Sequence, residues 1–307
     1  MQALFALTFP IGKKLLMYVP PAISTGIRFI IAGICFLGWT WYTEGVDALS
    51  AYAQRVYQEK IKWLMVIGCY VYFAYLPEAW ALQYMSAFKA NLLWSTLPFI
   101  SAFFEYILYG MVLRAQQWLG MFIGMCGALM IVMSHESSEV ALASSVGMWL
   151  PEIALTISVG ATAYAWFMIK DLSSAGYSMS WINGAAMLSG GIASVLTGIG
   201  YEHIPMDCSA WFYGMALIMG LVIISNITAY TIYGFLLQTC SITFLSFSGF
   251  LCPIFGAFFC TVFCHDPLPL VYVYALVGIL SGLYLFYREE LAHEACSIRE
   301  DVDLKKQ

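Results

Sequence analysis

The chain has 307 residues, of which 62% are hydrophobic and only 10% are charged, and its formal net charge is −5. Soluble globular domains carry about 25% charged residues, so this composition excludes the soluble class. The chain is therefore predicted to be an integral membrane protein.

Ten apolar runs follow one another along the chain, and each is close to the roughly 20 residues that a membrane-spanning helix needs. They cover residues 1–19, 22–42, 63–85, 87–111, 117–133, 148–169, 179–200, 211–237, 241–263 and 269–287. Lipid offers backbone polar groups no partners, and the alternating ten-residue segments of a barrel are absent. We therefore predict an all-α integral membrane fold with ten transmembrane helices.

Charged residues gather in the connections, chiefly in 43–62 and 134–147, and in the tail 288–307. If both termini are cytoplasmic, the cytoplasmic segments hold Arg55, Lys60, Lys62, Arg114, Lys170, Arg288, Arg299, Lys305 and Lys306. The opposite loops then hold only Lys89, at the mouth of the fourth span. This asymmetry follows the positive-inside rule and predicts a multi-pass protein with both termini in the cytoplasm.

The chain also repeats itself at an offset of 155 residues. Residues 82–104 align with 237–259 without gaps, with identical leucine, glutamine, serine, proline, alanine and phenylalanine positions. This register predicts two five-helix repeats, and because five is odd, the second repeat must cross the membrane in the inverted sense. The predicted units are the first repeat 1–133, a polar linker 134–147, the second repeat 148–287 and a cytoplasmic tail 288–307.

Inverted repeats are typical of secondary transporters, which bind substrate between the two halves near the bilayer midplane. The pattern therefore predicts a transporter that moves a small organic metabolite by alternating access. It does not favour an enzyme, because neither an HExxH nor a GxSxG motif occurs. A lipid flippase or a channel-like protein on the same fold stays open as the alternative.

The most informative polar residue is Glu78, which follows Pro77 deep in the third span. An ionised group at the bilayer centre costs about 2.5–3.5 kcal/mol, so it is expected to face a cavity or a partner. Tyr75 lies on the same helix face, and the repeat aligns Tyr230 with Tyr75 and Tyr233 with Glu78. Two repeat-related helices are thus predicted to present polar, aromatic faces to a central cavity.

The predicted substrate site comprises Lys13, Arg28, Tyr75, Glu78, Asn91, Trp94, Ser95, Asn226, Tyr230 and Tyr233. Glu78 is expected to bind a cationic group or a proton, with tyrosines and Trp94 adding cation–π contacts. The alternative is a structural ion pair of Glu78 with Lys13 or Arg28, and the two roles are not exclusive. The mixture of charges and aromatic rings suits a zwitterion with a flat ring or a cationic centre.

Other partners are predicted more simply. No cofactor and no nucleic acid are expected, only a small-molecule substrate and membrane lipid. A metal site at Cys260, Cys264, His265 and Asp266 is disfavoured, because no second Cys/His pair accompanies this cluster. GxxxG patterns at 120–124 and 278–282 predict close helix packing, within the monomer in preference to a homodimer, which stays possible.

Three passages, 7–33, 81–132 and 236–286, resemble the drug/metabolite transporter superfamily of the EamA type. Lys13 and Arg28 fall on the lysine and the second-span arginine of that family. The resemblance implies ten spans in two inverted repeats, and a bacterial inner membrane is the expected location. Members carry amino acids, nucleotide sugars and, in some intracellular bacteria, S-adenosylmethionine, so an amino acid or S-adenosylmethionine is the expected substrate. Members usually have more apolar residues before the first span, which leaves a true start upstream of Met1 open.

Overall fold

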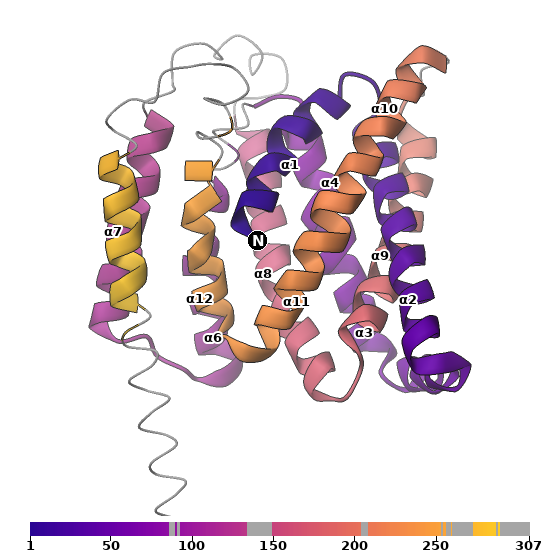
Figure 1. The fold of residues 1–307 in the computed structure, drawn as a ribbon, viewed down its shortest axis with the longest axis horizontal. Coiled ribbons are helices and arrows are strands. Elements are labelled where there is room, and N and C mark those ends of the chain that lie inside the picture. The colour runs from indigo at the N-terminus through magenta and orange to yellow at the C-terminus, as the bar shows by residue number, and fades with distance from the viewer. Residues whose placement is uncertain are drawn as a thin grey trace, which may run out of the picture.

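In a computed structural model of the chain, the described residues are 1–85, 90, 93–133, 149–203, 208–252, 254–255, 259, 273–286 and 288. Within these ranges every regular element is a helix, and the helices stand side by side in a bundle (Figure 1). Five are long and apolar enough to cross a membrane: Pro21–Gln58, Lys60–Ala81, Leu150–Ser174, Met179–Tyr201 and Trp211–Thr239. The predicted all-α, multi-pass membrane fold is confirmed, and the count of ten spans stays a prediction.

The first half contains α1 (Gln2–Leu15), α2 (Pro21–Gln58), α6 (Leu97–Tyr109) and α7 (Ala115–Met133). Between α2 and α6, one continuous crossing is built from α3 (Lys60–Ile67), the π-helix η1 (Gly68–Tyr72) and α4 (Phe73–Ala81). Pro21 begins α2 and Pro98 is the second residue of α6, positions where the missing proline N–H costs no helical hydrogen bond. Gly110 ends α6 in the left-handed region, with φ of 67°.

The second half contains α8 (Leu150–Ser174), α9 (Met179–Tyr201), α12 (Ile242–Phe247) with the 3₁₀ turn η4 (Ser248–Phe250), and the apolar helix Val273–Phe286. Its long crossing joins α10 (Cys208–Leu221), the π-helix η3 (Val222–Ala229) and α11 (Tyr230–Thr239). The side chains of Ser178 and Ser241 accept backbone N–H bonds at the starts of α9 and α12. Each serine thus caps the start of its helix by satisfying one backbone N–H group that has no partner within the helix.

The polar connection 43–62 is mostly helical, because α2 continues to Gln58 beyond a kink at Gly45, where φ is 84°. A glycine without a Cβ takes this backbone conformation without steric cost. Beyond the kink, the Arg55 guanidinium donates to the Ala175 carbonyl at 2.6 Å and lies 4.5 Å over the ring of Tyr177. The Tyr177 hydroxyl donates to Glu59 at 3.2 Å, so the end of α2 holds the turn between α8 and α9.

Helices α2 and α9 pack closely along glycines. A Cβ at Gly26 would lie 2.4 Å from Val195, whereas one at Gly33 would lie 2.6 Å from the backbone of Leu188. Moving forward along α2 therefore moves the contact backward along α9, so the two helices are antiparallel. The missing side chain of each α2 glycine makes room for α9, as is common between membrane helices.

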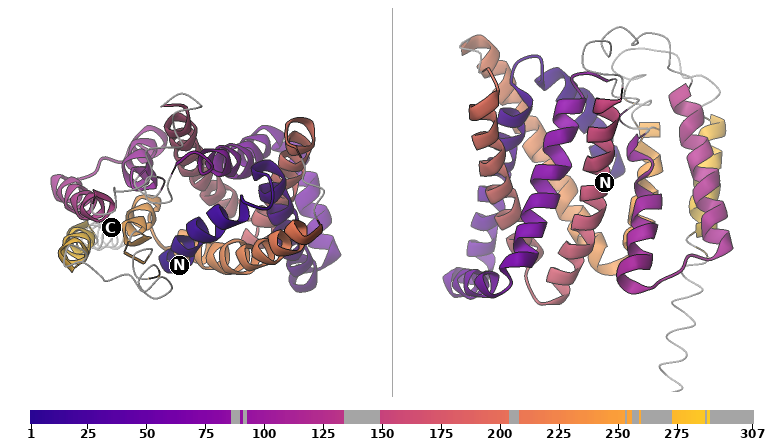
Figure 2. Two further views of the ribbon diagram at one scale, coloured as in Figure 1. Left: turned by 90° about the horizontal axis from the view of Figure 1, so that it is seen from above. Right: turned by 180° about the vertical axis from the view of Figure 1, so that it is seen from behind.

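Buried apolar side chains form three clusters. The largest runs through α1, α2, the η1 crossing, α8, α9 and the η3 crossing. A second joins α6, α7, α12 and Val273–Phe286, and a third joins α1, α4 and α8. The GxxxG glycines belong to the second region, where a Cβ at Gly120 would lie 2.7 Å from the Gly282 carbonyl. Figure 2 shows α7 beside the C-terminal apolar helix Val273–Phe286. The two glycine patterns therefore pack against each other within one chain, as predicted.

Candidate functional site

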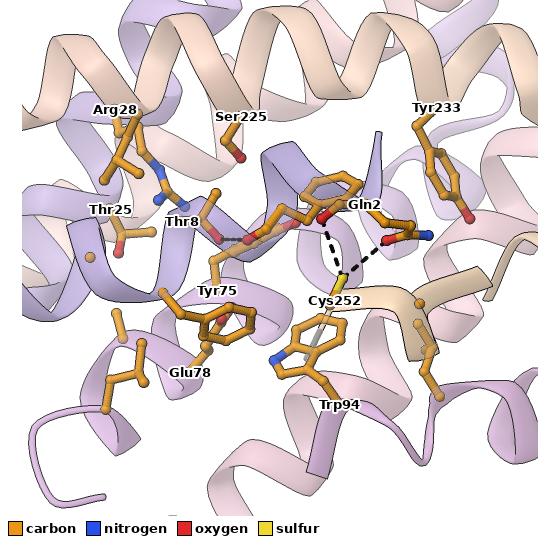
Figure 3. A pocket seen from close by; sticks show the side chains of 18 of the residues that line it. Gln2, Thr8, Thr25, Arg28, Tyr75, Glu78, Trp94, Ser225, Tyr233 and Cys252 are labelled. Carbon is orange, nitrogen blue, oxygen red and sulfur yellow. Dashed lines mark hydrogen bonds between the residues drawn. The ribbon is translucent and has the colours of Figure 1, made fainter. Parts of the chain in front are cut away.

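A cavity opens between helices of the two halves (Figure 3). The first half lines it with α1, α2, α4, Trp94 and Ser95 before α6, and the start of α6. The second half lines it with α8, the ends of α10 and η3, α11, and the α12–η4 segment. Among the described lining residues, Arg28 and Glu78 are the only arginine, lysine, aspartate or glutamate side chains.

These two charged side chains share one end of the cavity. The Arg28 guanidinium carbon lies 4.9 Å from the ring centroid of Phe29 and 5.5 Å from that of Tyr75. Tyr75 stands three residues before Glu78 on α4, so the two side chains lie on one helix face. Arg28 is thus held on the face of α4 that carries Glu78, and the guanidinium makes cation–π contacts with both rings.

Arg28 and Glu78 lie close enough for each charge to act on the other, although no hydrogen bond joins the two side chains within the described residues. The Nε atom of Arg28 is buried and has no hydrogen-bond partner. The structural ion pair of Glu78 with Lys13 or Arg28 therefore stays a prediction. The Arg28 Nε keeps capacity for a ligand, whereas Tyr75, expected to contact a ligand cation, already contacts Arg28.

The other end of the cavity is aromatic. The rings of Trp166 on α8 and Tyr233 on α11 have centroids 4.3 Å apart, and Phe5 on α1 meets Tyr233 edge-on at 6.5 Å. The Tyr233 hydroxyl is buried without a hydrogen-bond partner. Figure 3 shows Arg28, Thr25 and Glu78 toward one side and Tyr233 at the opposite side, with Trp94 between them.

Each long crossing beside the cavity contains a π-helix, η1 in the first half and η3 in the second. Shifted back by the 155-residue repeat offset, η3 covers residues 67–74 and therefore overlies η1 at Gly68–Tyr72. Tyr230 directly follows η3 and Tyr75 lies three residues after the end of η1, and the rings of these two tyrosines lie 6.5 Å apart. The two crossings thus approach each other at these rings, and their relation by an inverted repeat stays a prediction. Segments of this kind are frequent at functional sites.

Six of the predicted site residues line the cavity: Arg28, Tyr75, Glu78, Trp94, Ser95 and Tyr233. Tyr230 and Asn226 are almost fully buried but are not among its lining residues. Tyr230 instead packs edge-on against Phe5 and Tyr70, with centroids 5.8 Å and 5.6 Å away. Lys13 lies on α1 and does not line the cavity, and Asn91 lies outside the described residues.

Several lining residues were not predicted, namely Gln2, Thr8, Thr25, Trp166, Ser225 and Cys252. The Cys252 thiol donates to Gln2 Oε1 at 3.2 Å, and the Gln2 amide donates to Ser248 Oγ at 2.5 Å. These bonds fix the start of α1 against the α12–η4 segment. No group of three or more metal-ligating side chains occurs within the described residues, and the Cys260–Asp266 cluster lies outside them.

Below the aromatic end, polar contacts join α6 to the second half. The Thr243 hydroxyl donates to the buried carboxylate of Glu105, and the hydroxyls of Ser101 and Ser246 bond at 2.8 Å. The Tyr109 hydroxyl donates to Asp171 at 2.7 Å on the same side. These bonds and the Trp166–Tyr233 pair join helices of the two halves.

Comparisons with known proteins agree with this architecture. The model of the EamA-like transporter family matches residues 2–133. An S-adenosylmethionine/S-adenosylhomocysteine transporter of Chlamydia muridarum is 28% identical over 290 residues, which cover 92% of this chain and 88% of that protein. A transporter of the same name from Chlamydia trachomatis serovar L2 is 27% identical over 288 residues, which cover 92% of this chain and 85% of that protein. One solved crystal structure has a similar fold, with a TM-score of 0.70 and 17% sequence identity. The match covers 93% of this chain and 94% of that protein.

Proposed function

We propose that this chain, a member of the EamA-like transporter family, is a secondary transporter that moves an S-adenosylmethionine-like zwitterion across the membrane by alternating access. The observation that carries the proposal is the cavity between the two halves, which is lined by one cation, Arg28, with an unpaired Nε, and one anion, Glu78. The names of the chlamydial relatives support this substrate class.

The architecture proposed for this function is ten spans in two inverted five-helix repeats. Two features support the inversion. Helices α2 and α9 occupy the second position of their halves and pack antiparallel, as inverted copies must. The π-helices η1 and η3 fall at equivalent positions of the 155-residue repeat. Transporters of this design bind substrate where the repeats meet.

Alternating access requires a barrier on one side of the bound substrate at a time. The bonds between α6 and the second half form such a barrier at one end of the cavity. Figure 1 shows the lower end of α6 on the same side as the kinked end of α2, which carries Arg55. By the positive-inside rule this side is cytoplasmic, with both termini there and the bacterial inner membrane as the location.

Uptake into vesicles reconstituted with the purified protein tests the proposal. We expect saturable uptake of radiolabelled S-adenosylmethionine that excess S-adenosylhomocysteine inhibits. Glu78→Gln is expected to reduce the initial rate by about tenfold or more, because hydrogen bonds to charged groups contribute about 1.5–3 kcal/mol. Glu44→Gln is the matched control, since Glu44 is exposed and lies outside the cavity.

Wild-type rates for Glu78→Gln at equal protein content would refute the role of this carboxylate. Vesicles that move a labelled lipid between leaflets, but accumulate no soluble solute, would instead identify a flippase. Counterflow separates a carrier from a channel, because only a carrier exchanges external label against an internal pool of unlabelled substrate.

A further inference from the structure

The two ends of the cavity differ in a way that fixes how a ligand lies in it. One end holds Arg28 and Glu78, and the other holds the rings of Trp166, Tyr233 and Phe5. Within the described residues, no other full charge lines the cavity. A ligand with one zwitterionic end and one flat neutral end matches this division.

The charged end suits an amino acid head. Arg28 cannot lose its proton in a protein, and the Tyr75 and Phe29 rings hold it in place. An α-amino acid carries a carboxylate and an ammonium on neighbouring atoms, so one head can compensate Arg28 and Glu78 together. Both charges are then paired, which removes the cost of an uncompensated charge away from water.

A sulfonium group at Glu78 would not achieve this. It brings one positive charge and no acceptor, so Arg28 would lose water and gain no partner. Removing one partner of a buried ion pair is strongly destabilising for the same reason. A sulfur atom midway along the ligand, in contrast, would lie between the charged end and the rings of Trp166 and Tyr233.

We propose that Arg28 binds the carboxylate and Glu78 the ammonium of the amino acid head, while the aromatic end holds the nucleobase. In this orientation the positive charge on sulfur does not contribute to binding. This inference rests on the proposed function. Its consequence is that S-adenosylmethionine and S-adenosylhomocysteine bind with similar affinity, although they differ by one unit of charge. The methionine part, not the sulfonium, then selects the ligand.

Binding to the purified wild-type protein in detergent, measured by isothermal titration calorimetry, tests the orientation without any substitution. We expect Kd values within about threefold for S-adenosylmethionine and S-adenosylhomocysteine. Decarboxylated S-adenosylhomocysteine is expected to bind about tenfold or more weakly, because a charged hydrogen bond is lost. A large loss on removing the sulfonium charge, with little loss on removing the carboxylate, overturns the proposal.

The variant Glu78→Gln gives a second test. It is expected to raise Kd for S-adenosylmethionine and S-adenosylhomocysteine by the same factor, about tenfold or more. Binding of 5′-methylthioadenosine, which lacks the amino acid head, is expected to be unchanged. A loss confined to S-adenosylmethionine places the sulfonium at Glu78 and overturns the orientation, as does an equal loss for 5′-methylthioadenosine.

These outcomes differ from a failure of the proposed function. If the wild-type protein binds neither S-adenosylmethionine nor S-adenosylhomocysteine, both proposals fall. If it binds and transports both, and the patterns above are reversed, only the orientation is wrong.

Discussion

Replacing Gly33 by alanine tests the close packing of α2 on α9. The added Cβ would lie 2.6 Å from the backbone nitrogen and 2.8 Å from the Cα of Leu188. Carbon atoms in contact prefer about 3.5–4.0 Å, so the two helices must separate by roughly 1 Å. Overpacking of this kind costs about 1–3 kcal/mol. The added methyl group would meet backbone atoms, which cannot move aside as the end of a side chain can. We therefore expect Gly33→Ala to lower the free energy of unfolding by about 1–3 kcal/mol.

Thermal unfolding in detergent measures this effect. A loss of 1 kcal/mol shifts Tm by about 2–4 °C in chains of 150–250 residues, so a fall of roughly 2–12 °C is expected. Gly38→Ala is the matched control on the same helix, because a Cβ there has no atom within 4 Å. Alanine favours helix over glycine by up to about 1 kcal/mol, so this control should melt no lower than wild type. Equal Tm values for the two variants would refute the reasoning.

Two further substitutions test polar contacts. Tyr70→Phe removes the 2.8 Å bond to the Asn183 side chain and leaves a buried amide oxygen unpaired, so a loss of about 1–3 kcal/mol is expected in thermal unfolding. Glu202→Ala removes a carboxylate that accepts the Ala22 and Ile23 N–H groups at 2.7 and 3.1 Å, and is expected to cost about 0.5–2 kcal/mol.

Substitutions at exposed positions control for these effects. Tyr57→Phe is the control for Tyr70→Phe, and Asp47→Ala, which also removes a carboxylate, is the control for Glu202→Ala. Both residues are exposed on α2, so each control should leave Tm within about 1 °C of wild type. An equal fall for Tyr57→Phe would show that Tyr70 acts by something other than its bond to Asn183. An unchanged Tm for Glu202→Ala would show that water replaces the carboxylate at the start of α2.

The sequence predicted the helices well where apolar length alone decides. The third span, expected at 63–85, is Lys60–Ala81. The 155-residue repeat offset aligned Tyr75 with Tyr230, and the rings of these two residues lie 6.5 Å apart. Glu78 was found because a carboxylate at that depth is costly. These signals depend on composition and spacing, which the sequence displays directly.

Other features of the cavity have no signal in the sequence. Asn226 was predicted as a site residue on the assumption of a regular helix, but it lies in the π-helix η3 and is not a lining residue. The wider turn of a π-helix changes which residues share a face, and no residue pattern signals that change. Thr8, Thr25 and Ser225 carry small hydroxyls that membrane helices tolerate anywhere. Trp166 was overlooked because a tryptophan among apolar residues gives no sign of facing inward.

The three buried clusters have a consequence for how this chain must be made. Each contains side chains from before and after the 134–147 segment: Phe29 with Phe167, Met121 with Phe247, and Phe9 with Leu155. A gene cut at that segment would yield two fragments, each with incomplete interiors in all three places. Neither piece is expected to persist when produced alone, whereas synthesis of both in one cell would let them complete each other.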